Sequence, residues 1–268
     1  MTLEQKKSLA LFLDRAAALL GDGYLRPGES FDEPDAADGT VADGTVADGD
    51  TTGAGNTDDI TAAAVDTAAG DTMEGIAADI RSCRACPLGT GKTYAVPGEG
   101  ADDPLVLVLG EGPGQDEDRT GRPFVGRAGQ LLDRMLASIG LRREENCFIA
   151  NVVKCRPPEN RDPEPTEIAA CAPFLRRQIG RLKPRIILCV GRIAANAALG
   201  NAEMQSIGSL RGRFYPYRAG PEGPESPVPL IATYHPSALL RNEDLKRPAW
   251  EDLKLLRSRL DALNPRRS

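Results

Sequence analysis

Four short, continuous apolar runs rich in Val, Ile and Leu predict buried β-strands. They cover residues 105–109, 147–153, 186–190 and 230–233. Apolar positions at helical spacing predict helices at residues 128–139, 166–182, 192–199 and 250–263. Strands that alternate with helices of this length form a parallel sheet with helices on both faces. The expected fold is therefore a three-layer α/β/α domain around a four-stranded parallel sheet.

The first 72 residues follow a different pattern. Apolar residues at helical spacing predict an amphipathic helix at residues 1–20, which packs on the main domain or, as the alternative, docks a partner protein. Residues 21–72 contain few large apolar side chains and a near-repeat of Ala-Asp-Gly that begins at Ala37, Ala42 and Ala47. Such a stretch buries too little apolar surface to offset its ordering entropy, so we expect a disordered acidic linker. The folded domain is expected at residues 73–268.

Charge divides the chain at nearly the same place. The whole chain holds 33 Lys and Arg residues against 39 Asp and Glu residues, a formal net charge of −6. Residues 1–79 contribute 4 basic and 17 acidic residues, a net of −13, and residues 80–268 contribute 29 and 22, a net of +7. The acidic average therefore does not exclude a polyanionic ligand for the folded domain. No apolar run suits a membrane span or a signal peptide, which predicts a cytoplasmic protein without membrane attachment.

Four of the six cysteines lie in predicted turns or helix starts and form a candidate metal site. Cys83 and Cys86 make a Cys-x-x-Cys pair, and Cys155 and Cys171 follow at wider spacing. The other two lie within apolar strands, where a thiol behaves as a small apolar side chain. In a chain without an export signal, thiols or metal ligands are expected rather than disulfides. The spacing leaves zinc, an iron–sulfur cluster and four unligated thiols open.

Polar and glycine-rich motifs follow three of the predicted strands, at the carboxyl ends where parallel sheets bind ligands. The first strand leads into Gly110-Glu-Gly-Pro-Gly and Gly121-Arg-Pro-Phe-Val-Gly, the second into Asn151-Val-Val-Lys-Cys-Arg-Pro-Pro, and the fourth into His235-Pro-Ser. The first motif lacks the third glycine of a dinucleotide fingerprint, and no strand precedes the Gly-Lys-Thr at residues 91–93 as a phosphate loop would require. A buried asparagine at such an edge, as expected for Asn151, offers both a hydrogen-bond donor and a hydrogen-bond acceptor to a base.

In their order and residue types, these motifs and the cysteine spacing resemble the family 4 uracil-DNA glycosylases, iron–sulfur enzymes of the uracil-DNA glycosylase superfamily. The resemblance covers residues 73–263. It implies a DNA-repair hydrolase that flips uracil out of DNA and cleaves its N-glycosidic bond in base excision repair. It also implies a 4Fe–4S cluster on Cys83, Cys86, Cys155 and Cys171, and uracil-containing DNA as the substrate. We expect the enzyme to be a monomer.

The resemblance implies a uracil site built from all three motifs. Phe124 would stack on the flipped base, and Asn151 would bind the O4/N3 edge, which cytosine presents in reverse. His235 would donate a hydrogen bond to O2, where negative charge grows as the bond breaks. Gly112 would belong to the same site. Glu117 would crowd the position of a thymine methyl group and so exclude thymine.

The resemblance also implies catalytic and DNA-contacting residues. Glu111 belongs to the uracil site as well, and it would stabilise the sugar cation or position the attacking water. Asn160 would help to orient that water or the Glu111 carboxylate. Leu239, Leu240 and Arg241 would form a wedge that fills the gap left by the flipped base. Better-known superfamily members have an aspartate where this chain has a glycine after Glu111, which leaves the general base unassigned.

A class of the superfamily that bonds covalently to abasic DNA uses a histidine after the second strand, and this chain has none there, which argues against that activity. Two alternatives to the enzyme stay open from the sequence. A non-catalytic iron–sulfur module for DNA binding or replication is the main rival to the enzyme. A zinc-binding nucleotide hydrolase is the third interpretation.

Overall fold

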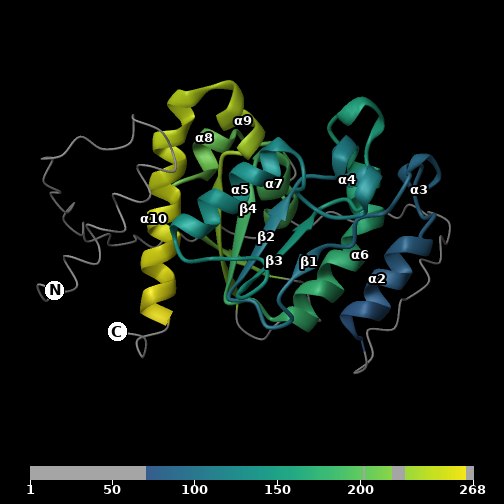
Figure 1. The fold of residues 1–268 in the computed structure, drawn as a ribbon, viewed down its shortest axis with the longest axis horizontal. Helices are drawn as coiled ribbons and strands as arrows, with labels where there is room; N and C mark the ends of the chain where they lie inside the picture. The colour runs from purple at the N-terminus through teal and green to yellow at the C-terminus, as the bar shows by residue number, and fades with distance from the viewer. Residues whose placement is uncertain (1–70, 202, 219–226, 264–268) are drawn as a thin grey trace, which may run out of the picture.

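The computed structural model describes residues 71–201, 203–218 and 227–263, which form an α/β fold (Figure 1). The predicted helix at residues 1–20 and nearly all of the predicted linker lie outside the described residues. In chain order the elements, with η for a 3-10 helix, are α2 (Met73–Ser82), α3 (Leu88–Gly91), β1 (Glu99–Gly100), β2 (Val106–Gly110), α4 (Gln115–Thr120), α5 (Arg127–Ser138), β3 (Cys147–Asn151), η1 (Pro158–Asn160), α6 (Pro165–Leu182), β4 (Ile186–Val190), α7 (Arg192–Leu199), α8 (Ile207–Leu210), β5 (Phe214–Tyr217), β6 (Val228–Thr233), α9 (Pro236–Arg241), η2 (Glu243–Leu245) and α10 (Lys246–Leu263).

The sheet has six strands in the order β1-β3-β2-β4-β6-β5. The four predicted strands form its parallel centre, as β3, β2, β4 and β6. The prediction of a four-stranded sheet was incomplete, because β1 and β5 add an antiparallel strand at each edge. Neither edge strand carries the pattern of a buried strand, since β1 has two residues and β5 contains Pro216, which only an edge position tolerates well.

Helices cover both faces of the sheet, as the alternation of strands and helices predicts. Leu107 and Leu109 point to one face, where the core is completed by residues of α2, α6 and α7. Val106 and Val108 point to the other face and pack with residues of α5 and α10. In Figure 1 the strands accordingly lie between α10 on the left and α2 and α6 on the right.

The two residues before the predicted boundary at residue 73 contact the folded domain. Thr72 caps the amino end of α2, because its Oγ1 accepts a hydrogen bond from the Gly75 N–H at 3.0 Å. Both carboxylate oxygens of Asp71 accept hydrogen bonds from Arg177 of α6 at 2.7 Å. These contacts join Asp71 and Thr72 to the domain rather than to the linker.

The carboxyl ends of the central strands bring the three motifs to one edge of the sheet. β2 ends at Gly110, which pairs in register with Asn151 at the end of β3. β6 ends at Thr233, two residues before His235. The edge therefore gathers the residues that the sequence singles out.

Within the described residues, no helix has the length and apolar character needed to cross a membrane.

Candidate active site

Gly110 opens the space in which two of the predicted base-contacting residues meet. A β-carbon at Gly110 would lie 2.3 Å from Asn151 Oδ1 and 2.6 and 2.7 Å from two ring carbons of Phe124. Real β-carbons essentially never approach other atoms within 3.0 Å. Glycine is therefore required for Phe124 and Asn151 to converge at the end of β2. The next predicted residue of this turn, Gly112, lies against the side chain of Val153.

Asn151 is almost completely buried, with 1% of its surface exposed. Its Oδ1 has no hydrogen-bond partner among the described residues. An unpartnered buried acceptor costs free energy unless a ligand satisfies it. Lys154, which is also 1% exposed, holds the backbone of this residue, because its Nζ donates to Asn151 O at 2.8 Å and to Gln178 Oε1 at 2.6 Å. The backbone of Asn151 is thus fixed, and its side-chain acceptor faces the space beside Gly110.

His235 lies directly before α9, and its ring is held by the first turn of that helix. The Ser237 N–H donates to His235 Nδ1 at 3.2 Å, and Ser237 Oγ lies 2.8 Å from the same nitrogen. Because Nδ1 accepts, the proton of the neutral ring lies on Nε2. Burial lowers the pKa of His235 to about 4, assisted by the positive charge of Arg241 and opposed by Glu117. The ring is therefore neutral near pH 7 and presents an Nε2–H donor.

The ring of Phe124 lies beside that of His235. The two ring centroids are 5.7 Å apart, and the ring planes are inclined by 33°. Phe124 is 7% exposed and packs against the core residues under α5 and α10. The structure thus brings Phe124, Asn151 and His235 together, although they come from three separate motifs of the sequence.

Glu111 lies at the entrance of the same turn, in a partly buried position. The pKa of Glu111 is raised to about 7, chiefly by burial and also by the negative charge of Asp162, while the positive charge of Arg192 opposes the shift. Asp162 and Arg192 themselves form an ion pair of 2.6 Å. The sequence did not point to either residue, because they lie before α6 and at the start of α7, outside the recognised motifs. Their opposite charges modify the pKa shift that burial imposes on Glu111.

Glu117 of α4 makes three hydrogen bonds to backbone N–H groups. Its Oε1 accepts from Val125 at 2.8 Å and Gly126 at 3.1 Å, and its Oε2 accepts from Gly114 at 3.0 Å. The carboxylate therefore fixes the loop that carries Phe124 to the turn that follows β2. The sequence prediction gave Glu117 a steric role against thymine, and the structure adds this positioning contact.

The remaining predicted residues lie in different environments. Asn160 is exposed on η1, and its Oδ1 accepts a hydrogen bond from Arg156 Nε at 2.7 Å. Leu239 is 2% exposed and belongs to the core, because the turn of α9 on which it lies faces α5. Leu240 and Arg241 are exposed at the end of α9. Of the three predicted wedge residues, Leu240 and Arg241 are thus exposed and Leu239 is not.

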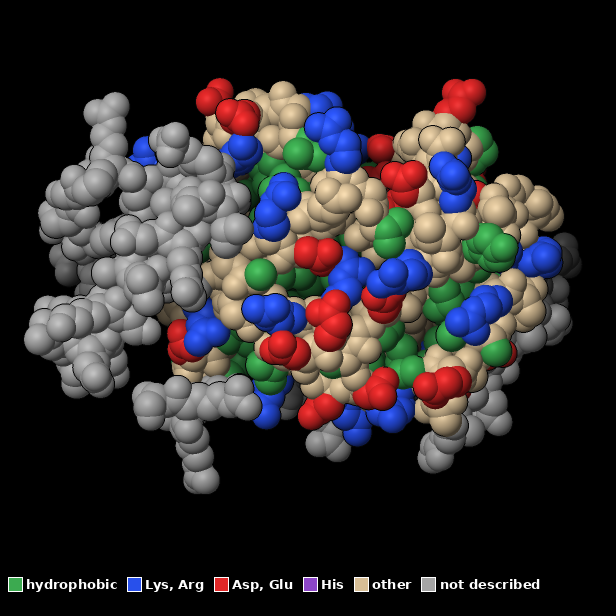
Figure 2. All heavy atoms as spheres, in the orientation of Figure 1, with side chains coloured by type: hydrophobic (Ala, Val, Ile, Leu, Met, Phe, Trp, Pro, Cys, Tyr) green, Lys and Arg blue, Asp and Glu red, His purple; other side chains and the backbone are tan. Residues whose placement is uncertain are grey.

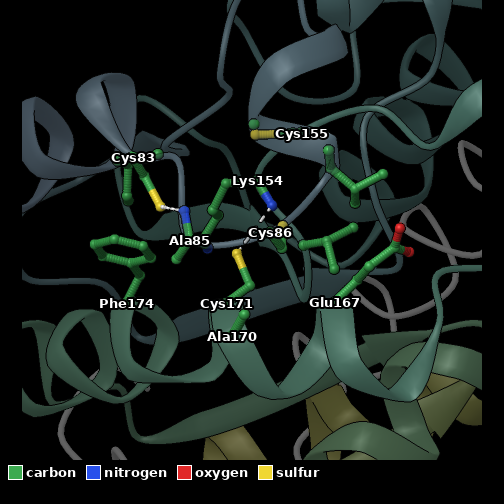
Figure 3. Close-up of a pocket in the computed structure, with 13 residues that line it drawn as sticks. Cys83, Ala85, Cys86, Lys154, Cys155, Glu167, Ala170, Cys171 and Phe174 are labelled. Atoms are coloured by element: carbon green, nitrogen blue, oxygen red, sulfur yellow. Dashed lines mark hydrogen bonds between the residues drawn. The ribbon is translucent and has the colours of Figure 1, made fainter. Parts of the chain in front are cut away.

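The four predicted metal-binding cysteines line one pocket (Figure 3). Cys83 follows α2, Cys86 lies in the next turn, Cys155 follows β3 and Cys171 belongs to α6. Two backbone N–H groups point at sulfurs, from Ala85 to Cys83 Sγ at 3.4 Å and from Lys154 to Cys171 Sγ at 3.3 Å.

The same pocket disfavours the thiolate forms of its two buried cysteines, Cys155 and Cys171. Burial raises the pKa of Cys155 to about 11, the positive charge of Lys92 lowers it, and the other three cysteines of the pocket raise it. Within the described ranges, no three or more His, Cys, Asp and Glu side chains are arranged to hold a metal ion as they stand. The donor chemistry nevertheless fits an iron–sulfur cluster, which takes four cysteine thiolates and is tuned by N–H groups directed at sulfur.

Comparison with known proteins identifies the family. The family model of the uracil DNA glycosylase superfamily matches residues 97–254. The chain belongs to this superfamily. It is similar to the type-4 uracil-DNA glycosylase of Archaeoglobus fulgidus, with 44% identity over 187 residues that cover 69% of this chain and 91% of that protein.

Two further type-4 enzymes show a similar match. The type-4 uracil-DNA glycosylase of Sulfurisphaera tokodaii is 42% identical over 200 residues, 74% of this chain and 88% of that protein. The type-4 enzyme of Thermotoga maritima is 43% identical over 190 residues, 70% of this chain and 94% of that protein. The predicted resemblance to the family 4 group is thereby confirmed.

The surface of this uracil-DNA glycosylase family member carries both signs of charge on the face viewed in Figure 1. Figure 2 shows Lys and Arg side chains interspersed with Asp and Glu side chains there. The positive net charge of residues 80–268 is therefore not gathered into one patch on that face.

Proposed function

We propose that the protein is a uracil-DNA glycosylase that removes uracil from DNA and leaves an abasic site, as the first step of base excision repair. The observation that carries the proposal is the convergence of Phe124 and Asn151 at Gly110, with the ring of His235 beside that of Phe124. An aromatic face, a buried amide with an unused acceptor and a neutral histidine with its proton on Nε2 match the face, the O4/N3 edge and the O2 of uracil.

Uracil is inaccessible while it is stacked in DNA, so the nucleotide must be flipped into the pocket at a cost of a few kcal/mol. Phe124 would offset part of this cost by stacking on the extruded base. Leu240 and Arg241, exposed at the end of α9, would enter the gap left in the DNA stack.

Asn151 would select uracil over cytosine. Its Oδ1 would accept from uracil N3–H, and its amide would donate to O4. Cytosine presents an acceptor at N3 and a donor at its amino group, so the same contacts would leave buried polar groups unpaired. Sites built to hydrogen-bond a polar group of the substrate reject analogues that leave their buried polar groups unpaired by roughly 10⁴–10⁵.

His235 would stabilise the leaving group. Hydrolysis breaks the bond between uracil N1 and C1′ of the sugar, the electron pair leaves with the base, and water supplies the hydroxyl at C1′. Negative charge then grows on O2, where the Nε2–H of His235 donates a hydrogen bond without a change in protonation. Loss of one such donor costs roughly 2.7–4 kcal/mol in comparable sites.

Glu111 would stabilise the positive charge on the sugar when its carboxyl group is ionised. Its partial burial strengthens that interaction, since the effective dielectric constant is lower there than in water. Asn160 is exposed and bonded to Arg156. A role for Asn160 in orienting water requires it to turn toward Glu111 once DNA is bound.

We also propose a 4Fe–4S cluster on Cys83, Cys86, Cys155 and Cys171. Four thiols from three chain segments around one pocket, with N–H groups directed at two sulfurs, support it. The cluster would serve as a structural clamp, because it would join α2, the loop after β3 and α6 with no thiolate left for chemistry. A spectrum without visible absorption in protein purified anaerobically would favour zinc instead.

The test is an alkali-cleavage assay on an oligonucleotide with a single uracil. The wild-type protein is expected to produce strand scission at the uracil, and the variants H235A and N151A to slow it by about a hundredfold. N196A is the matched control, since Asn196 is also a buried asparagine but lies in α7.

Each component of the proposal fails on a different result. A wild-type protein that binds DNA but never produces scission would favour the non-catalytic iron–sulfur module. Full activity in H235A and N151A would overturn the site assignment alone. The cytoplasmic location, the monomeric state and a partner for the N-terminal helix stay predictions.

A further inference from the structure

The loop that carries Phe124 has an unfavourable backbone conformation. Phe124 has a φ of +52°, in the left-handed region that residues with a β-carbon adopt infrequently. Such a conformation persists only where surrounding contacts hold it, and these positions cluster at functional sites. The contacts that hold this loop therefore decide where the aromatic ring lies.

One side of the loop is held by the carboxylate of Glu117, through the N–H groups of Val125 and Gly126. The α5 helix supports it as well, because a β-carbon at Gly129 would lie 1.9 Å from the carbonyl oxygen of Phe124. Neither contact satisfies the carbonyl groups at the start of the loop.

Arg143 binds those carbonyl groups from the other side. Its Nη1 donates to Pro123 O and its Nη2 to Phe124 O, both at 3.1 Å. The side chain is 7% exposed, and Asp133 of α5 balances its charge through hydrogen bonds of 3.1 and 2.7 Å. Glu99 adds a second carboxylate at 3.7 Å.

The guanidinium group is suited to this task and an ammonium group is not. Arginine presents several N–H donors in a rigid plane, so one side chain can bond to two successive carbonyl oxygens and to a carboxylate at once. A buried arginine is costly unless all these contacts are made. Arg143 lies outside every recognised motif, and its loop partners are 19 and 20 residues away in the chain.

We propose that Arg143 is a positioning residue for uracil excision, which holds the left-handed backbone of Phe124 so that the ring is ready to stack on the flipped base. The inference rests on the proposed function. Arg143 does not touch the base, so its effect on the reaction passes through Phe124.

A double-mutant cycle with single-turnover uracil excision tests this inference. R143M is expected to reduce the maximal rate by about tenfold or more in the wild-type background, because stacking is misaligned. In the F124A background, R143M is expected to reduce it by less than about twofold, because the ring through which it acts is gone. Equal losses in the two backgrounds would overturn the inference.

R257M is the matched control. Arg257 also donates to a backbone carbonyl, Ile139 O at 3.1 Å, and pairs with Asp261, but it does not contact the Phe124 loop. R257M is expected to excise uracil at the wild-type rate. Thermal unfolding of each variant fixes an assay temperature at which all are folded.

R143K keeps the positive charge beside Asp133, and it replaces R143M in the same test if R143M does not fold. It is expected to lose about fivefold or more, since it loses the paired bonds to the two carbonyl groups. A wild-type rate for R143K and R143M would overturn this inference and leave the proposed function standing. A wild-type protein that releases no uracil would instead overturn the proposed function.

Discussion

The ionisation of Glu111 gives a prediction that can be worked out from the structure. Burial and the charge of Asp162 raise the pKa of Glu111 from 4.5 to about 7, and an ionised carboxylate is the form that stabilises a sugar cation. Below that pKa the ionised fraction falls about tenfold per pH unit, so the single-turnover rate at about pH 5 should be roughly a hundredfold below its plateau. A carboxyl group with an ordinary pKa would still be mostly ionised there.

The assay is a pH profile of uracil excision under single-turnover conditions. His235 does not contribute to the acidic limb of the profile, because burial lowers its pKa to about 4 and the ring stays neutral between about pH 5 and the plateau. E111Q should remove the acidic limb and lower the plateau. D162N should move the limb of the profile to lower pH, since it removes a like charge, and R192M should move it to higher pH. A wild-type limb at about 4.5 or lower, or an unchanged limb in E111Q, would refute the reasoning.

Three further predictions concern the pocket, the wedge and the cluster. G110A places a β-carbon 2.3 Å from Asn151 Oδ1 and should reduce excision by about a hundredfold while the protein stays folded; normal activity would contradict the pocket geometry. L240A should slow excision from duplex DNA more than from single-stranded DNA, whereas L255A, with the same 41% exposure, should match wild type; equal effects would exclude the wedge. C171S should abolish visible absorption and lower the melting temperature; an unaltered spectrum would contradict the ligand set.

The four central strands were predictable because the sequence of each strand alone carries the pattern of a buried strand. Each central strand is a continuous apolar run, and the two faces of β2 alternate between the two cores. The edge strands β1 and β5 exist only through their pairing with β3 and β6. Their own residues, such as Pro216, do not specify a strand.

The site was predictable as a set of motifs but not as a set of contacts. Asn151 ends β3 and His235 follows β6, so a parallel sheet places both residues at the same edge. Leu239 and Leu240 could not be told apart, because the rotation of α9 depends on packing against α5 rather than on the sequence of the helix itself. The role of Arg143 could not be predicted from the sequence, because it binds backbone carbonyl groups, which every residue has.

The pocket is expected to remove uracil and not the other pyrimidines. The most direct measurement is chromatography of the free bases released from three oligonucleotides that differ only in uracil, cytosine or thymine at one position. We expect release of uracil alone by the wild-type protein, and a loss of about a hundredfold in that release by H235A. Release of no base, of cytosine or thymine as readily as uracil, or of uracil at the same rate by H235A would contradict this expectation.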